Sequence, residues 1–338
     1  MTSVDISRLL AQGAQRLLEG GLVAFPTETV YGLGADAENP QAIARIYAAK
    51  GRPANHPVIV HVAPDADLTY WVKSVPAEAR ALMQAFWPGP LTLILPRAQH
   101  IPAAVSGGQD SVGLRCPAHP IAQELLRQFA RLKPNGQGGV AAPSANKFGQ
   151  VSPTHASHVR AEFSGLTESE LMILEGGPAQ VGIESTIIDL SRLDRGIGPV
   201  LLRPGHISAA QIGAVLGAEP AHPDAFAPQV SGSLKAHYAP RTPLYVLSTA
   251  QLLNRIEKER IAGRVAAVAF HPPGDTANSD VDWYPCAADP HAYARDLYAL
   301  LRDLDERGYA AILFEQPPRT LAWQAVNDRI GRAAAAFS

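Results

Sequence analysis

The chain has 338 residues, more than one hydrophobic core normally holds, so we expect two domains. With 46% hydrophobic and 18% charged residues it has a globular composition, and its net charge of −2 gives no bulk indication of a nucleic-acid or membrane partner. Cys116 and Cys286 form no zinc spacing and no disulfide framework, which fits a reducing cytosol. No apolar run approaches the ~20 residues that span a bilayer, and the N-terminal pattern is that of an amphipathic helix rather than a signal peptide. We therefore expect a cytoplasmic globular protein.

The first part of the chain alternates amphipathic stretches with short apolar runs. Helical spacing or capping signals predict helices over 3–19, 40–50, 76–86, 119–131 and 208–216, and Ser152-Pro-Thr154 predicts a further helix start. Short apolar runs predict strands over 22–25, 57–62, 91–96, 111–115, 140–146, 171–174, 182–189 and 200–203. This order predicts an α/β sheet with polar groups at its strand ends.

The composition changes at residues 217–243, where five prolines stand among Ala, Gly and Ser, as is typical of a linker. Beyond it, strands are predicted over 244–247, 264–270 and 309–314, and helices over 249–261, 289–306 and 321–336. Regular alternation of this kind predicts a small parallel-sheet domain with helices on its faces. The predicted organisation is thus 1–216, a linker over 217–243, and 244–338.

Polar side chains gather where these strands end. The stretch 26–34 places two hydroxyls and a carboxylate directly after the first strand, and cations recur at Lys50, Arg52, Arg115 and Arg203. A single arginine at a strand end is usually a solvated surface charge. Repeated at loop after loop beside small hydroxyl side chains, the cations favour a polyphosphate or carboxylate ligand.

Several common site motifs are excluded or weak. There is no Gly-Lys-Ser/Thr of a P-loop and no Gly-x-Ser-x-Gly of a covalent hydrolase. The glycines of 32–37 follow the strand too late for the tight turn of a dinucleotide fingerprint. His56 and His61 have no third metal ligand near them in sequence, and a histidine inside an apolar run is more often a packed core residue.

Eight ordered segments carry a family resemblance. They are Pro26-Thr-Glu-Thr-Val-Tyr-Gly-Leu-Gly34, Lys50-Gly-Arg-Pro53, Pro57-Val-Ile-Val-His61, Trp87-Pro-Gly-Pro-Leu-Thr92, Ala142-Pro-Ser-Ala-Asn146, Ser152-Pro-Thr154, Glu184-Ser-Thr186 and Leu202-Arg-Pro-Gly205. Together they resemble the YrdC-like threonylcarbamoyl-adenylate synthases. His237-Tyr-Ala-Pro240 and the added αβ domain resemble the long, two-domain form of that family.

The resemblance implies a fold and a reaction. The fold is a twisted open α/β sheet with a concave cleft, followed by a linker and a small Rossmann-like parallel domain. The reaction joins L-threonine, bicarbonate and ATP, carried with Mg²⁺, to give L-threonylcarbamoyl-AMP, pyrophosphate and water. This is the first step of threonylcarbamoyladenosine formation beside the tRNA anticodon. A downstream transferase complex would take the product, and tRNA contact would be weak or indirect.

The resemblance also implies residue roles. Lys50, Arg52, Ser144 and Asn146 would form the reaction centre. ATP would be bound by these four residues together with His56, Ser111, Ser152, Arg203 and Tyr238. L-threonine would be bound by Thr27, Thr29, His61, Arg115, Ala142 and Ser185. No protein side chain is expected to bind the metal.

The linker departs from the family pattern. Linkers of the family commonly read Ser-Pro-Gly-Met-Lys-Tyr before His-Tyr-Ala-Pro, whereas this chain has Val230-Ser-Gly-Ser-Leu-Lys235. Gly232 is kept and the proline is replaced by Ser231. Tyr238 would still fold over the cleft as a lid outside either core.

Other functions remain as alternatives. Hydrogenase maturation proteins that share the fold form a related carbamoyl-adenylate, but the acylphosphatase and zinc-finger segments they carry do not occur in this sequence. An RNA-binding module on the concave face would be expected to show a basic surface with stacking aromatics, which a net charge of −2 and 7% aromatics disfavour. For the C-terminal domain, the roles of lid anchor, partner dock and stabiliser stay open.

Overall fold

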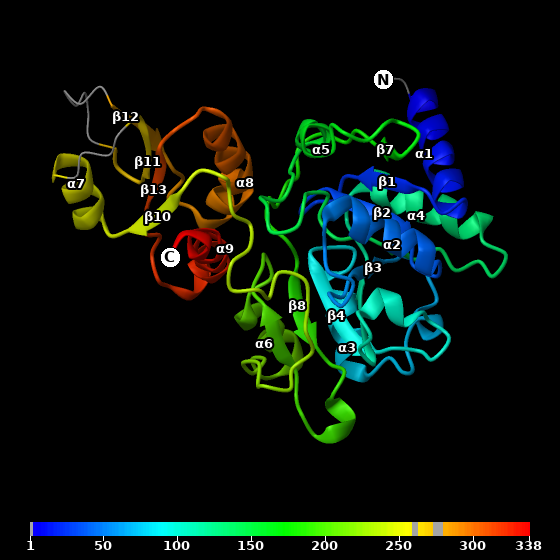
Figure 1. The fold of residues 1–338 in the computed structure, drawn as a ribbon. Coiled ribbons are helices and arrows are strands. Elements are labelled where there is room, and N and C mark those ends of the chain that lie inside the picture. The colour runs from blue at the N-terminus through cyan, green and yellow to red at the C-terminus, as the bar shows by residue number, and fades with distance from the viewer. Residues whose placement is uncertain (1–2, 259–262, 273–279) are drawn as a thin grey trace. The chain divides into compact units, whose positions relative to one another are not determined.

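The computed structural model describes residues 3–258, 263–272 and 280–338, and the chain forms two compact units (Figure 1). The first unit contains Met1–Phe148 and Pro153–Ser233, and the second contains Gly149–Ser152 and Leu234–Ser338. The predicted linker is therefore shared, with 217–233 in the first unit and 234–243 in the second. The short segment Gly149–Ser152 belongs to the second unit although the chain on both sides of it belongs to the first.

The first unit is built on a mixed nine-stranded sheet, which confirms the predicted α/β class. Its strand order is β7-β1-β2-β6-β3-β5-β4-β8-β9, with parallel pairs β1–β7, β3–β5 and β4–β8 and antiparallel pairs elsewhere. The strands are β1 (Leu22–Phe25), β2 (Gly32–Asp36), β3 (Ile59–His61), β4 (Leu91–Pro96), β5 (Ser111–Arg115), β6 (Val140–Ala141), β7 (Leu171–Ile173), β8 (Thr186–Asp189) and β9 (Val200–Arg203).

The sequence missed one strand of this sheet and made four others too long. Strand β2 runs antiparallel to β1 over residues read as loop, and Gly34 leaves room there for the Phe25 ring, because a Cβ would lie 2.8 Å from Phe25 Cε1. The strands predicted over 57–62, 140–146, 171–174 and 182–189 shrink to β3, β6, β7 and β8.

Alternation along the strands assigns the two faces of this sheet. Leu22 and Ala24 pack into the larger core, beneath α2, α3, α5 and α6, whereas Val23 and Phe25 pack into a second core beneath α1 and α4. The helices of the first unit are α1 (Ser3–Leu18), α2 (Pro40–Lys50), α3 (Ala77–Phe86), α4 (Pro120–Leu132), α5 (Ala156–Glu162) and α6 (Ala209–Leu216), with short 3₁₀ segments η1 (Leu68–Tyr70), η2 (Ala103–Ser106) and η3 (Leu193–Arg195). Helix α5 begins after His155, a little later than Ser152-Pro-Thr154 suggested. Because side chains alternate between the two faces along a strand, only every second side chain of a strand can contact a ligand on a given face.

The second unit is a four-stranded, wholly parallel sheet, as the alternation predicted. Its order is β10-β13-β11-β12, with β10 (Leu244–Leu247), β11 (Val265–Ala269), β12 (Val281–Pro285) and β13 (Ala311–Glu315). Helices α7 (Thr249–Lys258), α8 (Pro290–Glu306) and α9 (Gln324–Ala334) accompany η4 (Leu321–Trp323) and η5 (Ala335–Phe337). The predicted end of the helix over 249–261 lies outside the described residues.

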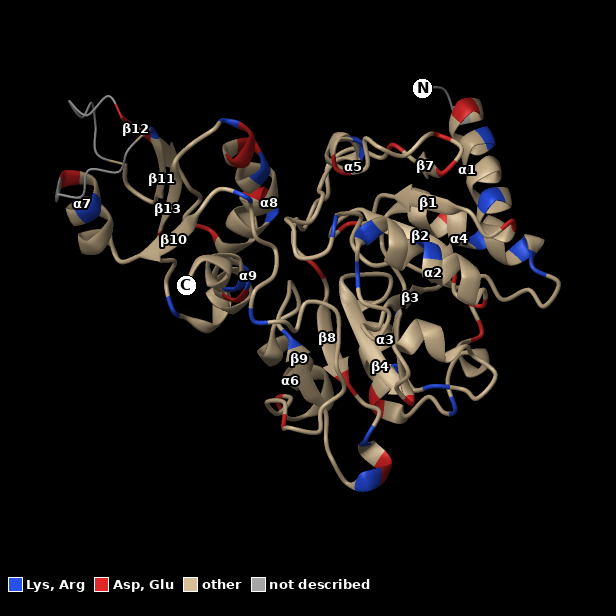
Figure 2. Ribbon diagram, in the orientation of Figure 1, with Lys and Arg blue, Asp and Glu red and all other residues tan. Residues whose placement is uncertain are grey.

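Strand β12 was not predicted. It is an edge strand that contains Asp282 and ends at Pro285, and its side chains are half-buried or exposed. An edge strand tolerates proline and charge, so β12 needs no apolar run of the kind that identified its neighbour β11. In Figure 2, most charged residues lie on helices and loops, and the strands of both units are largely uncharged.

Candidate functional site

Two loops separated by more than a hundred residues join at one end of the first sheet. The Leu33 N–H donates to the Pro143 carbonyl at 2.8 Å, and the Ala145 N–H donates to the Tyr31 carbonyl at 2.8 Å. Thr27 and Thr29 turn the first loop, with hydroxyl oxygens 2.9 Å apart, and both are almost fully buried. The loop that contains Thr27 and Thr29, which are predicted to bind threonine, is thus hydrogen-bonded to the Ser-x-Asn loop, which contains Ser144 and Asn146.

Lys50 ties the Ser-x-Asn loop to the end of α2. Its Nζ donates to the Ser144 carbonyl at 2.7 Å and to the Asn146 carbonyl at 2.5 Å, and the side chain is buried. Burial, followed by the neighbouring charge of Arg52, lowers the pKa of Lys50 well below its usual range. Lys50 therefore fixes the backbone that presents Ser144 and Asn146.

Arg203 at the end of β9 binds the start of the β8 segment. Its Nη2 donates to the Ser185 carbonyl at 2.8 Å and to the Ser185 hydroxyl at 3.1 Å, and that hydroxyl lies 2.8 Å from the Thr92 hydroxyl. Ser185 is predicted to bind threonine and Arg203 to bind ATP, so this contact joins the two predicted subsites.

Arg52, directly after α2, is the third buried cation predicted to bind ATP. Its Nη2 donates to the Pro57 carbonyl at 2.7 Å and to the Ser231 hydroxyl at 3.1 Å. Arg203 Nη1 donates to the Ser231 carbonyl at 2.9 Å. The two guanidinium groups thus share one linker residue.

Arg115, at the end of β5, forms a buried ion pair. Its Nη2 lies 2.7 Å from Glu28 Oε1, and Glu28 Oε2 accepts from the Ala118 N–H at 3.0 Å. Both side chains are about 5% exposed. Because Nη2 already donates to Glu28, a threonine carboxylate could not accept hydrogen bonds from both terminal nitrogens of Arg115 without competing with Glu28.

His61 lies on the sheet face that Arg115 shares, because the two residues pair across β3 and β5. It is 3% exposed, and its ring centroid lies 6.0 Å from that of Phe25. Burial, and then the charge of Arg115, lowers the pKa of His61 to about 3, so the ring is neutral at pH 7. Its Nδ1 is buried with no hydrogen-bond partner among the described residues, which leaves a polar atom for a ligand.

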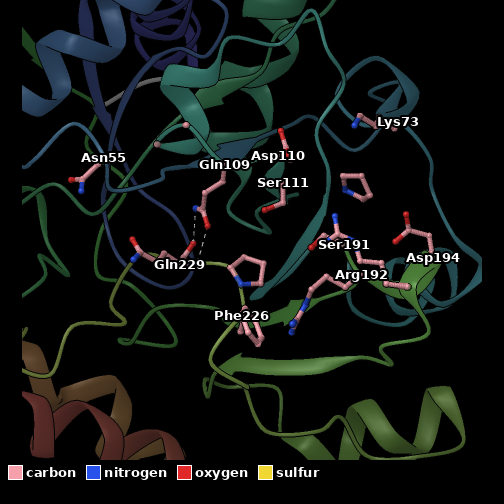
Figure 3. Close-up of a pocket in the computed structure, with 16 residues that line it drawn as sticks. Asn55, Lys73, Gln109, Asp110, Ser111, Ser191, Arg192, Asp194, Phe226 and Gln229 are labelled. Carbon is pink, nitrogen blue, oxygen red and sulfur yellow. Dashed lines mark hydrogen bonds between the residues drawn. The ribbon is translucent and has the colours of Figure 1, made fainter.

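The remaining predicted residues of the first unit lie around these groups. His56 packs its ring edge on Phe148 with centroids 5.2 Å apart, Ala142 is buried, and the Asn146 amide donates to the Lys147 carbonyl at 2.7 Å. Ser111 lines a pocket of about 610 Å³ together with Asn55, Lys73 and Arg192 (Figure 3). In that view, Gln109 and Gln229 are hydrogen-bonded to each other at one side of the pocket.

Ser152 and Tyr238 belong to the second unit. Tyr238 is 1% exposed, its ring lies 5.6 Å from that of Tyr298, and the Arg329 guanidinium lies 5.2 Å from its centroid. The expectation that Tyr238 stands outside either core is therefore wrong. Its backbone is in the left-handed region at φ 62°, which costs a non-glycine residue about 1 to 2 kcal/mol and is sustained by this packing.

Three residues that the sequence reading left without a role contact the predicted site. Glu28 pairs with Arg115, Thr92 meets Ser185, and Ser231 meets both arginines. Glu28 and Thr92 lie inside quoted motifs, so their position was a usable signal. The only sequence signal at Ser231 was that the linker departs from the family pattern at this position.

Two further features are absent from the described residues, namely a metal-binding cluster and a membrane-spanning helix. Among the described residues, no group of three His, Cys, Asp or Glu side chains could hold a metal ion. Within the same residues, no helix is both long enough and apolar enough to cross a membrane.

Known proteins resemble the chain over nearly its whole length. Residues 15–205 match a family model of Sua5, YciO and YrdC proteins that is described as "Telomere recombination". Residues 207–335 match a model described as "Threonylcarbamoyl-AMP synthase, C-terminal domain".

Individual relatives cover both units. Threonylcarbamoyl-AMP synthase of Pyrococcus abyssi is 38% identical over 93% of this chain and 91% of its own length. The synthase of Bacillus subtilis is 38% identical over 96% and 92%. The crystal structure of P. abyssi Sua5 complexed with L-threonine superposes with a TM-score of 0.81 at 36% identity, covering 97% of this chain and 94% of that one.

Proposed function

The chain belongs to the two-domain threonylcarbamoyl-AMP synthases of the Sua5 and YrdC type, and we propose that it forms L-threonylcarbamoyl-AMP from L-threonine, bicarbonate and ATP. Pyrophosphate and water are the other products. The observation that carries the proposal, beside the full-length similarity, is the bond from Arg203 to Ser185. It brings a cation suited to phosphate and a hydroxyl proposed for threonine to the same point of the sheet.

The chemistry requires positioning more than proton transfer. Bicarbonate takes up a proton and dehydrates to carbon dioxide and water, and the neutral amine of threonine adds to the carbon dioxide and releases a proton to give a carbamate. A carbamate oxygen then attacks the α-phosphorus of ATP, and pyrophosphate leaves. Negative charge on the phosphoryl oxygens must be neutralised, which suits Arg52 and Arg203. Fixing carbamate and nucleotide against each other supplies the rest of the acceleration.

The threonine subsite is proposed on the sheet face that carries His61, Arg115 and Ser185. Arg115 offers its charge to the threonine carboxylate, with Glu28 keeping the guanidinium in one orientation. Neutral His61 offers Nδ1 to the threonine hydroxyl or carboxylate. The packed loop of Thr27 and Thr29 would close this subsite.

The nucleotide subsite is proposed around Arg52 and Arg203, with Lys50 holding the backbone of Ser144 and Asn146. Ser111, His56, Ser152 and Tyr238 remain proposed nucleotide contacts. Mg²⁺ would enter as part of the substrate MgATP, held by phosphate oxygens and water. We further propose that a threonylcarbamoyl transferase takes the product for tRNA modification.

The deciding experiment measures pyrophosphate release from MgATP and bicarbonate, with and without L-threonine, and follows the adenylate product by mass spectrometry. We expect release that requires threonine, with loss of activity in Arg203→Met and normal activity in Arg131→Met, whose arginine is exposed in the last turn of α4. A folded protein that binds ATP but releases pyrophosphate without regard to threonine would contradict the proposal.

A further inference from the structure

Three consecutive linker residues are anchored on the first unit. The Gln229 N–H donates to Gln109 Oε1 at 2.8 Å, and the Gln229 carbonyl accepts from Gln109 Nε2 at 3.0 Å, as Figure 3 shows. Val230 is 5% exposed and packs with Ile94 and Ile187 on the sheet. Ser231 follows directly, so its position is fixed by an apolar contact and a double hydrogen bond on one side.

Ser231 places two oxygens on two arginines. Its hydroxyl accepts from Arg52 Nη2 at 3.1 Å and donates to the Pro57 carbonyl at 3.0 Å. Its carbonyl accepts from Arg203 Nη1 at 2.9 Å. Arg52 and Arg203 come from different elements, after α2 and at the end of β9, and are 7% and 2% exposed.

These are the donors that a triphosphate would use. Guanidinium N–H groups point in fixed directions, so a phosphate oxygen that accepts from the same N–H groups must take the place of the Ser231 oxygen already bound there. A phosphate oxygen forms a charge-assisted bond, which is roughly twice as strong as one to a neutral oxygen. Phosphate would therefore displace Ser231. The free energy that it gains by binding is reduced by the strength of the Ser231 hydrogen bonds that it replaces.

We propose that Ser231 sets the affinity of the nucleotide site, because it holds Arg52 and Arg203 with neutral oxygens that the triphosphate has to displace. The proposal rests on the proposed function, which assigns the two arginines to ATP. It gives a physical meaning to the linker departure: a proline at this position, as in the family pattern, has no hydroxyl to offer Arg52.

The test measures binding of MgATP to the full-length protein by calorimetry, without threonine. Ser231→Ala removes the hydroxyl that competes for Arg52, so we expect ATP to bind about three to five times more tightly, the effect of one neutral hydrogen bond. Ser231→Asp places a carboxylate beside Arg52, where it competes with phosphate for the guanidinium, and should weaken ATP binding at least tenfold. Ser231→Thr keeps the hydroxyl and should bind ATP like the wild type.

Ser233 provides the matched control. It is exposed and two residues further along the same segment, so Ser233→Ala and Ser233→Asp should leave ATP affinity unchanged. The dissociation constant of L-threonine should stay within twofold in all five variants, which separates this role from a general loosening of the fold. Thermal denaturation of each variant checks that it is folded.

Two results would overturn the inference while leaving the proposed function intact. One is a Ser231→Ala variant that binds ATP as the wild type does or more weakly. The other is a Ser231→Asp variant that binds ATP like Ser233→Asp. Should Ser231→Asp not fold, the Ala and Thr variants still decide the question. A wild type that binds no ATP would remove the proposed function and the inference together.

Discussion

The two units of this protein differ in how many charged and hydroxyl side chains they bury. The first unit buries four cations at or directly after the ends of its elements, namely Lys50 and Arg52 at α2, Arg115 at β5 and Arg203 at β9. In the described part of the second unit, buried polar side chains are confined to Ser152, His237, Thr242 and Arg329. Strands β10, β11 and β13 are almost entirely apolar, whereas β5 and β9 each end in a buried arginine.

This difference is expected if the first sheet is built around a ligand. Burying a charge costs several kcal/mol unless a partner compensates, so stability alone favours apolar residues at such positions. The first unit instead holds the buried Arg52, Arg115 and Arg203 with specific oxygens from other segments of the chain. The second unit has the composition expected of a stable scaffold, and the following changes test that contrast.

The largest effect is expected at the buried ion pair of the first sheet. Arg115→Met leaves the Glu28 carboxylate buried without its partner, which should lower the free energy of unfolding by about 3 to 5 kcal/mol and abolish threonine binding. Adding Glu28→Gln should restore much of the stability without restoring threonine binding. Urea denaturation and threonine calorimetry on both variants measure the two effects separately. Threonine binding in the stable double variant would remove Arg115 from the site.

The next effect concerns the cation that joins the two proposed subsites. Arg203→Met removes the charge from the phosphates and the donor from Ser185, so kcat/KM for ATP should fall by about 100-fold, or ~3 kcal/mol. Steady-state pyrophosphate release measures it, with Arg131→Met as the exposed control. A loss smaller than threefold would mean that the buried arginine serves the fold alone.

A moderate effect is expected in the pH dependence of stability. The pKa of His61 is lowered to about 3 in the folded protein, against a usual value near 6.5 when unfolded, so its contribution is present above pH 6.5 and is lost as pH falls toward 3. Between pH 7 and pH 5 the wild type should lose about 2 kcal/mol more than His61→Gln. Urea titrations at the two pH values provide the comparison, and equal losses would contradict it.

The smallest effect is expected in the second sheet. The Tyr293 hydroxyl is buried with no hydrogen-bond partner in the described part of the chain, so Tyr293→Phe should be neutral or stabilising by up to ~1 kcal/mol. Tyr31 of the first unit is its counterpart, because its hydroxyl donates to the Gly177 carbonyl at 2.8 Å and Tyr31→Phe should cost ~1 kcal/mol. A melting temperature that is unchanged or higher in Tyr293→Phe and lower in Tyr31→Phe would support the contrast between the sheets. Equal decreases in the two variants would contradict it.

Local patterns predicted most of the elements because they depend on neighbours in sequence. The apolar spacing over 3–19 and the Asn39-Pro40 signal gave α1 and α2 nearly to the residue, since amphipathic period and capping are properties of a single helix turn. The same logic failed at β2 and β12, whose strands are set by pairing partners rather than by their own apolar content.

By itself, then, the sequence determined the alternation of strands and helices, the division into two sheets and the motifs that place the chain in its family. Only the tertiary structure decided how the cations are held: Glu28 meets Arg115 across 87 positions, and Ser231 meets Arg52 across 179. Periodicity and capping act over one or two turns of chain, whereas the partner of a buried charge is whichever oxygen the packed sheet brings to it.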